Sequence, residues 1–320
     1  MAKGKRFEGL AADLLAHTTL RAKSLIVTVF GDAVAPHGGT VWLGSLIALL
    51  APFRVNERLV RTAVLRLSRE GWLASRQIGR RSYYSLTDGG WQRFEDAHRK
   101  IYAFQPAPWG GEWHIVFIGP GKLPIAERER LKSALNWQGF GNVGPGLLAH
   151  PSADPQALRH VLQELGVSDR VAIMRAKSDA LTSEGAMREL VRNAWNLDGL
   201  SSTYRGFLDR FQPIGSAFEA GRGADPATSF LIRVMAIHEY RRVLLRDPQL
   251  PEMLLPEDWA GAAARRLCRE IYRRAADSAE RHLKSLLEGP DGSLPEAEEY
   301  FYRRFGGLED SAPVRESAAV

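Results

Sequence analysis

The segment over residues 54–71 constrains the fold of this chain most, because it has the pattern of an amphipathic helix with two chemically distinct faces. Asn56 is a good N-cap and Gly71 a good C-terminal stop. Apolar residues recur between them at helical spacing and predict one buried stripe: Val60, Ala63, Val64 and Leu67. At about 100° per residue, the opposite face or its edge collects four arginines and two uncharged residues: Arg58, Arg61, Arg66 and Arg69, with Thr62 and Leu65.

No acidic residue lies on that arginine face. A helix that is only solvated usually mixes acids with its bases for support at i, i+4 spacing. A helix face that carries only positive charges therefore favours a polyanionic partner, and an ordinary solvent-exposed face is the alternative.

The residues before this helix predict a helix-turn-helix. Thr40 is expected to cap a helix that Pro52 ends, and a short turn over residues 52–55 joins it to the arginine helix. Two short, tightly linked helices, the second one basic, are typical of a motif whose second helix enters the DNA major groove. Residues 20–34 predict a first helix that completes a three-helix core.

The residues after the arginine helix predict a wing. Strand-like runs over 72–77 and 82–86 surround Gly79, which can supply the left-handed residue of a tight hairpin. The residues expected to cover the helices are Leu73, Tyr84 and Leu86. Those expected to project from the tip, towards phosphates or a narrow minor groove, are Arg76, Arg80 and Arg81. A solvated hairpin tip is the alternative.

The distribution of charge places this function in the first third of the chain. Residues 1–104 hold 16 Lys and Arg against 8 Asp and Glu, whereas the remainder holds 27 against 29. One cysteine, no signal peptide and no long apolar run favour a cytoplasmic protein without a membrane segment. A length of 320 residues predicts two or three domains.

The rest of the chain predicts an α+β protein: an N-terminal winged helix-turn-helix, a small ferredoxin-like middle domain and a mainly helical C-terminal domain. In the middle domain we expect strands at 113–118, 142–149 and 169–175 and helices at 126–137 and 155–165. The expected parts are a flexible arm at 1–19, a winged-helix DNA-binding domain with a connecting helix (91–104) at 20–105, a linker at 106–111, a ferredoxin-like α+β domain at 112–182, a helical C-terminal domain at 183–288 and a tail at 289–320.

Several segments together resemble one family. The segments are Ser24-Leu-Ile-Val-Thr-Val-Phe-Gly-Asp32, the arginine helix, a middle domain starting at Trp113, His238-Glu-Tyr-Arg-Arg242, Arg246-Asp-Pro248 and Leu254-Leu-Pro-Glu-Asp-Trp259. In this order they resemble the PaaX family, the transcriptional repressors of phenylacetic acid degradation. The likeness covers roughly residues 20–287. It implies a homodimer on double-stranded operator DNA, no cofactor, and an acyl-CoA effector such as phenylacetyl-CoA that releases the operator.

This resemblance directs the search for an effector site to the boundary of the middle and C-terminal domains. An aryl-CoA needs an aromatic-lined cavity beside a basic mouth. The candidates are His238, Tyr240, Arg241 and Arg242, with Trp195 and Tyr204 nearby. The alternative is that Arg241 and Arg242 pair with Glu239 or Asp247 at the surface.

An enzymatic function is the alternative from another class, because the middle domain resembles the ferredoxin-like nuclease of CRISPR adaptation. That nuclease carries a metal-binding aspartate at the end of its first strand, whereas residues 113–120 contain no carboxylate. His238-Glu239 begins like a zincin motif, but Arg242 stands where the second histidine is required. We therefore expect no catalytic residues and no metal site.

Overall fold

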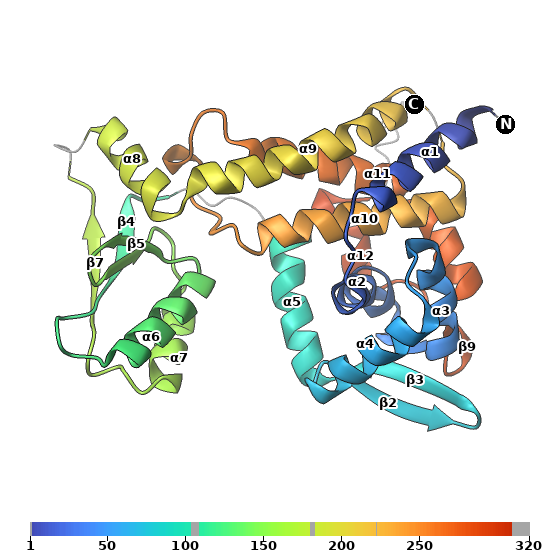
Figure 1. Ribbon diagram of the computed structural model, residues 1–320, viewed down its shortest axis with the longest axis horizontal. Coiled ribbons are helices and arrows are strands. Elements are labelled where there is room, and N and C mark those ends of the chain that lie inside the picture. Colours follow the sequence, from blue (N-terminus) through green and yellow to red (C-terminus); the bar gives the residue numbers. More distant parts are fainter. Residues whose placement is uncertain (1, 104–108, 180–182, 222, 309–320) are drawn as a thin grey trace, which may run out of the picture. The chain divides into compact units, whose positions relative to one another are not determined.

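The computed structural model describes residues 2–103, 109–179, 183–221 and 223–308, which form two compact units (Figure 1). The first unit comprises Met1–Phe104, Phe207–Arg241 and Ala264–Val320, and the second comprises Gln105–Gly206 and Arg242–Ala263. Three long helices belong partly to each unit: α9 (Leu197–Glu219), α10 (Pro226–Leu244) and α11 (Ala260–Leu286). The expected C-terminal domain is thus divided between two units, although the expected order of elements along the chain is retained.

The first unit contains the winged helix-turn-helix. Its elements are α2 (Ala22–Val29), the π-helical turn η1 (Phe30–Val34), η2 (Ala35–His37), β1 (Thr40–Trp42), α3 (Leu43–Leu50), η3 (Ala51–Phe53), α4 (Glu57–Arg69), β2 (Leu73–Ile78), β3 (Arg81–Leu86) and α5 (Asp88–Tyr102). Helix α4 is the arginine helix, and β2 and β3 form the wing beside it in Figure 1. The expected helix, turn, helix and hairpin are all present.

Helix α4 forms as its sequence predicts. The Asn56 side chain accepts a hydrogen bond from the Leu59 backbone N–H at 2.9 Å, which satisfies a backbone donor of the first turn. All four residues of the apolar stripe are buried: Val60, Ala63, Val64 and Leu67. After the helix, Gly71 has a φ of 70°, a left-handed conformation that glycine adopts at little cost.

The prediction that Thr40 caps α3 was wrong. Thr40 begins β1, and Trp42 occupies the N-cap position without a side-chain cap. Strand β1 pairs antiparallel with β3, and the wing sheet has the order β1-β3-β2. A β-branched pair, Thr40-Val41, suits this pairing, and Val41 is fully buried.

The wing buries a different tyrosine from the one expected. Directly opposite residues share a sheet face, and Arg76 lies opposite Tyr83 while Leu73 lies opposite Leu86. Tyr83 is buried on the Arg76 face, whereas Tyr84 and Leu86 are only half-buried. Tyr83 is thus buried on the face that alternation predicts to be solvated, where Arg76 and Arg81 remain exposed. The strand β8 (Glu288–Gly289) lies against the neighbouring strand β1.

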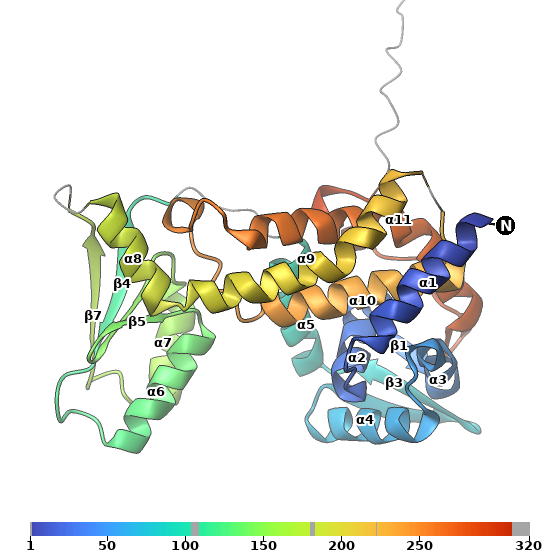
Figure 2. The same ribbon diagram turned by 45° about the horizontal axis from the view of Figure 1, so that its top comes forward.

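Residues 2–16, expected to be part of a flexible arm, form helix α1 (Ala2–Ala16). Phe7, Ala11 and Leu14 recur at i, i+4 and i+7 and are buried. The Phe7 ring lies 4.6 Å from that of Phe218 at the end of α9, beside α1 in Figure 2. The prediction missed this helix because its apolar stripe is short and its partner lies far along the chain.

The tail expected over 289–320 is structured as far as residue 308. After β8 it contains β9 (Gly292–Ser293), α12 (Glu299–Tyr302) and the turn η5 (Arg304–Gly306), all in the first unit. Phe301, Arg304 and Phe305 are buried. Of the aromatic residues in this segment, Phe301 and Phe305 are core residues, whereas Tyr302 is 42% exposed.

The second unit contains the ferredoxin-like domain. Its elements are β4 (Glu112–Phe117), α6 (Ile125–Trp137), β5 (Gly141–Gly144), β6 (Leu147–His150), α7 (Pro155–Glu164) and β7 (Ala172–Lys177), followed by α8 (Glu184–Ala194) and, later, η4 (Glu252–Leu254). The sheet is antiparallel with the order β5-β6-β4-β7. This βαββαβ order is that of a ferredoxin-like fold. The single strand expected at 142–149 is instead a hairpin, and Gly146 at its turn has a φ of 72°.

Candidate nucleic-acid interface

The arginine face of α4 is exposed along its length. Arg58, Arg61, Arg66 and Arg69 are all solvent-exposed, and Leu65 between them is 49% exposed. The Thr62 hydroxyl donates to the Arg58 carbonyl at 2.8 Å, which leaves its oxygen and methyl facing outward. Arginine recognises guanine bidentately, and apolar groups contact the thymine methyl. This face therefore has the side chains needed to read base edges.

Arg61 differs from the other three arginines of this face. Its guanidinium lies 2.7 Å from the carboxylate of Glu57, one turn earlier on the same helix. Both side chains are more than half exposed, so the pair contributes little and can exchange for another partner. The expected absence of acid thus holds for the face itself, but Glu57 borders it.

The C-terminal end of α4 contacts the rest of the winged helix through two cationic side chains. The Lys23 ammonium on α2 donates to the Glu70 carboxylate at 2.6 Å, just after α4 ends. The Arg93 guanidinium of α5 lies 4.9 Å from the centre of the Trp72 ring. Together with the buried stripe, these contacts hold the arginine face in one orientation.

The wing arginines fall into two classes. Arg76 and Arg80 are exposed and make no hydrogen bond or ion pair with any described residue. Arg81 is also exposed, but its guanidinium pairs with Glu288 and lies 4.2 Å from the centre of the Trp42 ring. The hydrogen bond that Arg81 donates to the Glu288 carboxylate raises the pKa of Arg81. Contrary to expectation, Arg81 does not project freely from the tip.

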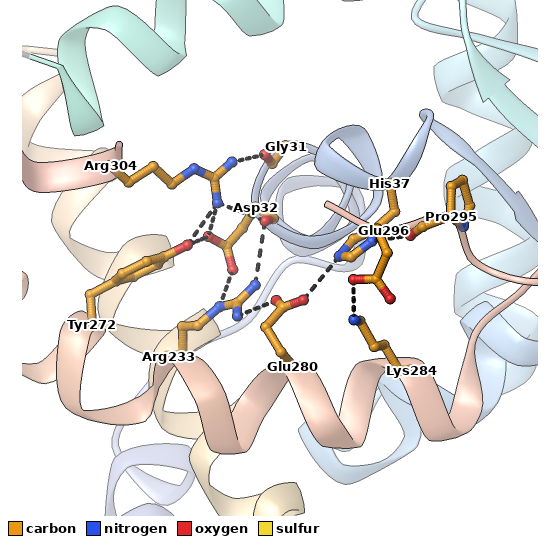
Figure 3. A network of polar contacts seen from close by, with 10 residues as sticks. All are labelled: Gly31, Asp32, His37, Arg233, Tyr272, Glu280, Lys284, Pro295, Glu296 and Arg304. Carbon is orange, nitrogen blue, oxygen red and sulfur yellow. Dashed lines mark hydrogen bonds and ion pairs between the residues drawn. The ribbon is translucent and has the colours of Figure 1, made fainter. Parts of the chain in front are cut away.

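A buried ionic network holds the end of α2 in the winged helix (Figure 3). Asp32, in the π-helical turn that continues α2, receives hydrogen bonds from Tyr102 at 2.9 Å and Tyr272 at 2.8 Å. Its other carboxylate oxygen accepts from Arg233 at 2.8 Å. Arg304 donates to the Asp32 backbone carbonyl at 2.8 Å and to its carboxylate at 3.1 Å. Asp32, Arg233 and Arg304 are at most 1% exposed.

The network continues through a second carboxylate. Arg233 donates to Glu280 at 2.6 Å, and His37 lies 3.0 Å from the other oxygen of that carboxylate. Burial alone would raise the pKa of Glu280, but Arg233 and His37 outweigh it and lower this pKa to about 2. Arg233, itself desolvated, has a raised pKa because Asp32, Tyr272 and Glu280 surround it. The charges are therefore paired, as burial requires.

The predicted effector residues are divided between the two units. His238, Tyr240 and Arg241 belong to the first unit, whereas Arg242, Trp195 and Tyr204 belong to the second. His238 is buried, and its Nδ1 lies 2.8 Å from the Thr28 hydroxyl on α2. Arg241 donates to the backbone carbonyl and the hydroxyl of Ser24, both at 3.0 Å. These residues dock α10 on α2.

The other effector candidates have structural contacts of their own. Tyr240 is buried with its ring 5.7 Å from that of Phe207. In the second unit the Tyr204 hydroxyl donates to Asp247 at 2.6 Å, and the Trp195 indole donates to the Gly139 carbonyl at 2.7 Å. Glu239, a partner named in the alternative pairing, lies 2.7 Å from Arg210.

Sequence reasoning missed the residues that tie the DNA-binding domain to distant helices. Asp32, Arg233, Glu280 and Glu288 were not singled out for any role. Their spacing carries no local signal, because Asp32 and Arg233 are 201 positions apart in the sequence. The one available hint was a charged Arg233 within an otherwise apolar helical stretch, since buried charges are paired.

Within the described residues, no group of three His, Cys, Asp or Glu side chains is placed to hold a metal ion. No helix in that part of the chain is long and apolar enough to span a membrane.

Comparisons with known proteins identify matches along almost the whole chain. Family models match residues 21–90 (PaaX-like protein), residues 106–189 (PaaX protein central Cas2-like domain) and residues 195–285 (PaaX-like protein C-terminal domain). A curated relative from Escherichia coli strain K12, the transcriptional repressor PaaX, is 41% identical over 287 residues, which cover 89% of this chain and 90% of the relative.

Among solved structures, an uncharacterized protein from Mycobacterium tuberculosis matches with a TM-score of 0.55 and 22% identity. The match covers 83% of this chain and 99% of that protein. At this level of identity the likeness supports the fold alone.

Proposed function

The chain belongs to the PaaX family of transcriptional repressors, and we propose that it represses genes for the catabolism of phenylacetate or related aromatic acids. The observation that carries its DNA contact is the exposed arginine face of α4, fixed by the Asn56 cap and a buried apolar stripe. We propose Arg58, Arg61, Thr62 and Arg66 as the residues that include the base readers. Arg69, Arg76, Arg80 and Arg81 would contact phosphates.

The proposed effector is an aryl-CoA thioester such as phenylacetyl-CoA. Support comes from membership of the family and from α10, which carries both the contacts to α2 and the residue Arg242 of the second unit. The effector must convert a dimer population that is almost wholly able to bind DNA into one that is almost wholly unable to. For this it must bind the state that cannot bind DNA about 5.5 kcal/mol more favourably than the other state. A ligand with several phosphates offers enough charge-assisted contacts for such a preference.

A gel-shift experiment with the DNA upstream of the chain's own gene tests both proposals. We expect a specific complex that phenylacetyl-CoA dissolves and free phenylacetate does not. If no aryl-acetyl-CoA releases the complex, the proposed effector is wrong, whereas the proposed DNA binding still holds. Absence of a complex on the upstream DNA and on aromatic-acid catabolic promoters would contradict repression of those genes.

The nuclease alternative has a separate readout in the same experiment. Cleavage of the probe that depends on a divalent cation would favour it. The curated relative is a repressor, and β4 with its exit lacks the aspartate that such a nuclease needs, so we expect an intact probe.

A further inference from the structure

The structured C-terminal segment, residues 288–308, lies across the winged helix and is called the C-terminal strap below. It begins at the wing, where β8 lies against β1 and the Glu288 backbone N–H donates to the buried Ser45 hydroxyl at 3.2 Å. At this point the Glu288 carboxylate pairs with Arg81. An acidic side chain from the far end of the sequence thus occupies one of the three wing arginines.

Contacts along the strap keep Glu288 at the wing. The His37 ring lies 2.6 Å from the Pro295 carbonyl, and the Glu298 backbone N–H donates to the Pro36 carbonyl at 2.9 Å. Lys284 donates to Glu296 at 2.6 Å, as Figure 3 shows. Because the strap is fixed at several places, Glu288 stays at a high effective concentration beside Arg81.

The far end of the strap is anchored most firmly. Arg304 inserts into the Asp32 network and donates to the Gly31 carbonyl at 3.1 Å as well as to Asp32 (Figure 3). Its side chain is fully buried, with aromatic rings of Tyr102 and Phe301 4.2 and 4.9 Å from the guanidinium carbon. Removing one partner of a buried charge pair leaves an uncompensated charge, so this anchor does not detach easily.

The Arg81–Glu288 pair itself remains accessible to a competing anion. The side chains of Arg81 and Glu288 are 47% and 40% exposed, so solvent and ions reach both. The Trp42 ring supports the guanidinium from one side, 4.2 Å away, and keeps it at the sheet surface. A phosphate and a carboxylate bind a guanidinium through the same pair of N–H donors, so the two compete for Arg81.

We propose that Glu288 sets the affinity of the wing for DNA, as an internal carboxylate that occupies Arg81 in the free protein and that a DNA phosphate displaces. This inference rests on the proposed DNA interface. Non-specific binding is almost wholly electrostatic, so an arginine that must first leave its carboxylate contributes less to it than Arg76 or Arg80 does. Glu288 also adds a negative charge where phosphates approach, which acts in the same direction.

The experiment compares the full-length protein with Glu288→Gln, which keeps the shape of the side chain and removes its charge. Binding to a non-specific duplex and to the upstream DNA is measured over a series of salt concentrations. We expect the variant to bind about two- to five-fold more tightly, as an exposed ion pair implies. The slope of log affinity against log salt should steepen by less than one, because in the wild-type complex the displaced carboxylate takes up part of the cation that the phosphate releases.

Glu296→Gln is the matched control, since it removes one charge from the strap at Lys284 and leaves the wing pair intact. It should change the affinity and slope less than Glu288→Gln. In an Arg81→Ala background, Glu288→Gln should give a smaller gain than in the wild-type background, because only the repulsion between Glu288 and the phosphates is then removed. Glu288→Asp, whose shorter side chain reaches Arg81 less well, should lie between the wild type and Glu288→Gln.

The outcomes separate this inference from the proposed function. Wild-type binding with an unchanged or weaker Glu288→Gln affinity, in a variant that melts like the wild type, overturns the inference alone. Failure of wild type and variant alike to bind either DNA overturns both. Binding that appears only in Glu288→Gln supports the inference.

Discussion

At the scale of single residues, Arg58 is the arginine of α4 best placed to read a base. It is exposed on the first turn and makes no ion pair among the described residues, whereas Arg61 pairs with Glu57. We expect Arg58→Ala to cost about 1–3 kcal/mol of operator affinity and to relax discrimination at one base pair. Binding to a set of operators, each changed at one base pair, measures both effects.

Arg69→Ala is the matched control for that substitution. We propose that Arg69 contacts a phosphate. Its removal should therefore lower the affinity for all operators by a similar factor and make the slope of log affinity against log salt shallower by about one. Full operator affinity in an Arg58→Ala, Arg61→Ala double variant would remove α4 from base recognition.

The lowered pKa of Glu280 predicts a pH-dependent contribution to stability. The folded protein holds this carboxylate ionised, with a pKa of about 2 against an ordinary value of 4.5. A depressed pKa means that the stabilisation is present above pH 4.5 and is lost as the pH falls towards 2. Glu280→Gln should therefore destabilise the first unit strongly at neutral pH and progressively less between these two values.

Chemical denaturation of wild type and Glu280→Gln at a series of pH values measures this difference. Glu257→Gln is the control, because the Glu257 side chain is 90% exposed and pairs with Arg188 only at 3.5 Å. It should cost little at any pH. A Glu280→Gln penalty that stays constant down to pH 2 would contradict the assigned role of this carboxylate.

The structural role of a single residue could be predicted where it depends on neighbours in the sequence. The buried stripe and the Asn56 cap were predicted, because helical spacing and capping involve neighbours within a few positions. The state of Arg81 was not, since its partner Glu288 is 207 positions away in the sequence. The hydrogen bonds of His238 and Arg241 to α2 were missed for the same reason.

At the scale of elements, the hairpin between β5 and β6 depends on Gly146. This glycine has a φ of 72°, and a Cβ built on it would lie 2.5 Å from the Ile118 carbonyl oxygen. Ala at this position meets both backbone strain and a backbone collision, so we expect Gly146→Ala to cost more than the ~1 kcal/mol of a left-handed alanine alone.

Gly166→Ala separates the two causes. Gly166 has a similar φ of 64°, but no atom lies within 4 Å of the position that a Cβ would take there. Thermal unfolding of both variants should show a clearly larger loss for Gly146→Ala. Equal losses of stability would mean that the hairpin backbone shifts to make room for the Cβ of the introduced alanine and that the close contact adds no measurable cost.

Helices and strands with strong hydrophobic periodicity were predicted. Those that form only through contacts with distant parts of the chain were missed. Helices α4, α6 and α7 lie within a few residues of their predicted ranges, and the wing hairpin was expected. Strand β1 was missed because its three residues acquire strand structure only by pairing with β3. The strap was predicted to be a tail, since its short elements are stabilised by contacts to Pro36, His37 and Asp32 that no local pattern reveals.

At the scale of the whole molecule, repression predicts a two-fold symmetric complex. One winged helix contacts too little DNA for tight specific binding, so we expect a homodimer on an inverted repeat with half-sites about 10 base pairs, or a multiple of that, apart. The candidate interfaces are the helical C-terminal third and α5. The apolar side chains Phe94, Ile101 and Tyr102 of α5 are buried within the first unit, which leaves fewer apolar residues of this helix for a partner.

Sedimentation of the free protein and footprinting of its complex test this symmetry together. The Arg58→Ala, Arg61→Ala double variant serves as the control, because it should remain dimeric while losing the footprint. A monomer at all concentrations that protects a single half-site would rule the dimer out.

The order of the domains was predictable from the whole sequence, but the division into units was not. Composition and the central linker separate the basic first third from the middle domain, and family models match these same segments. The helices α9, α10 and α11 carry continuous helical periodicity through the points where they change unit. Nothing in their sequence marks the boundary between Arg241 and Arg242.

That boundary predicts different roles for two adjacent arginines. Arg241 donates to the carbonyl and the hydroxyl of Ser24, so it fastens α10 to the first helix of the DNA-binding domain. Arg242 belongs to the second unit and is exposed, which makes it the better candidate for a phosphate of the proposed aryl-CoA. Arg241→Ala should lower the melting temperature and leave phenylacetyl-CoA affinity within about twofold of wild type.

Arg242→Ala should weaken phenylacetyl-CoA binding by about tenfold or more, because a hydrogen bond to a charged group contributes ~1.5–3 kcal/mol. Calorimetric titration with phenylacetyl-CoA in the absence of DNA separates effector binding from operator release, and free phenylacetate provides the comparison without phosphates. If Arg241→Ala loses effector binding while Arg242→Ala retains it, Arg241 and not Arg242 contributes to the effector site, in addition to its hydrogen bonds with Ser24.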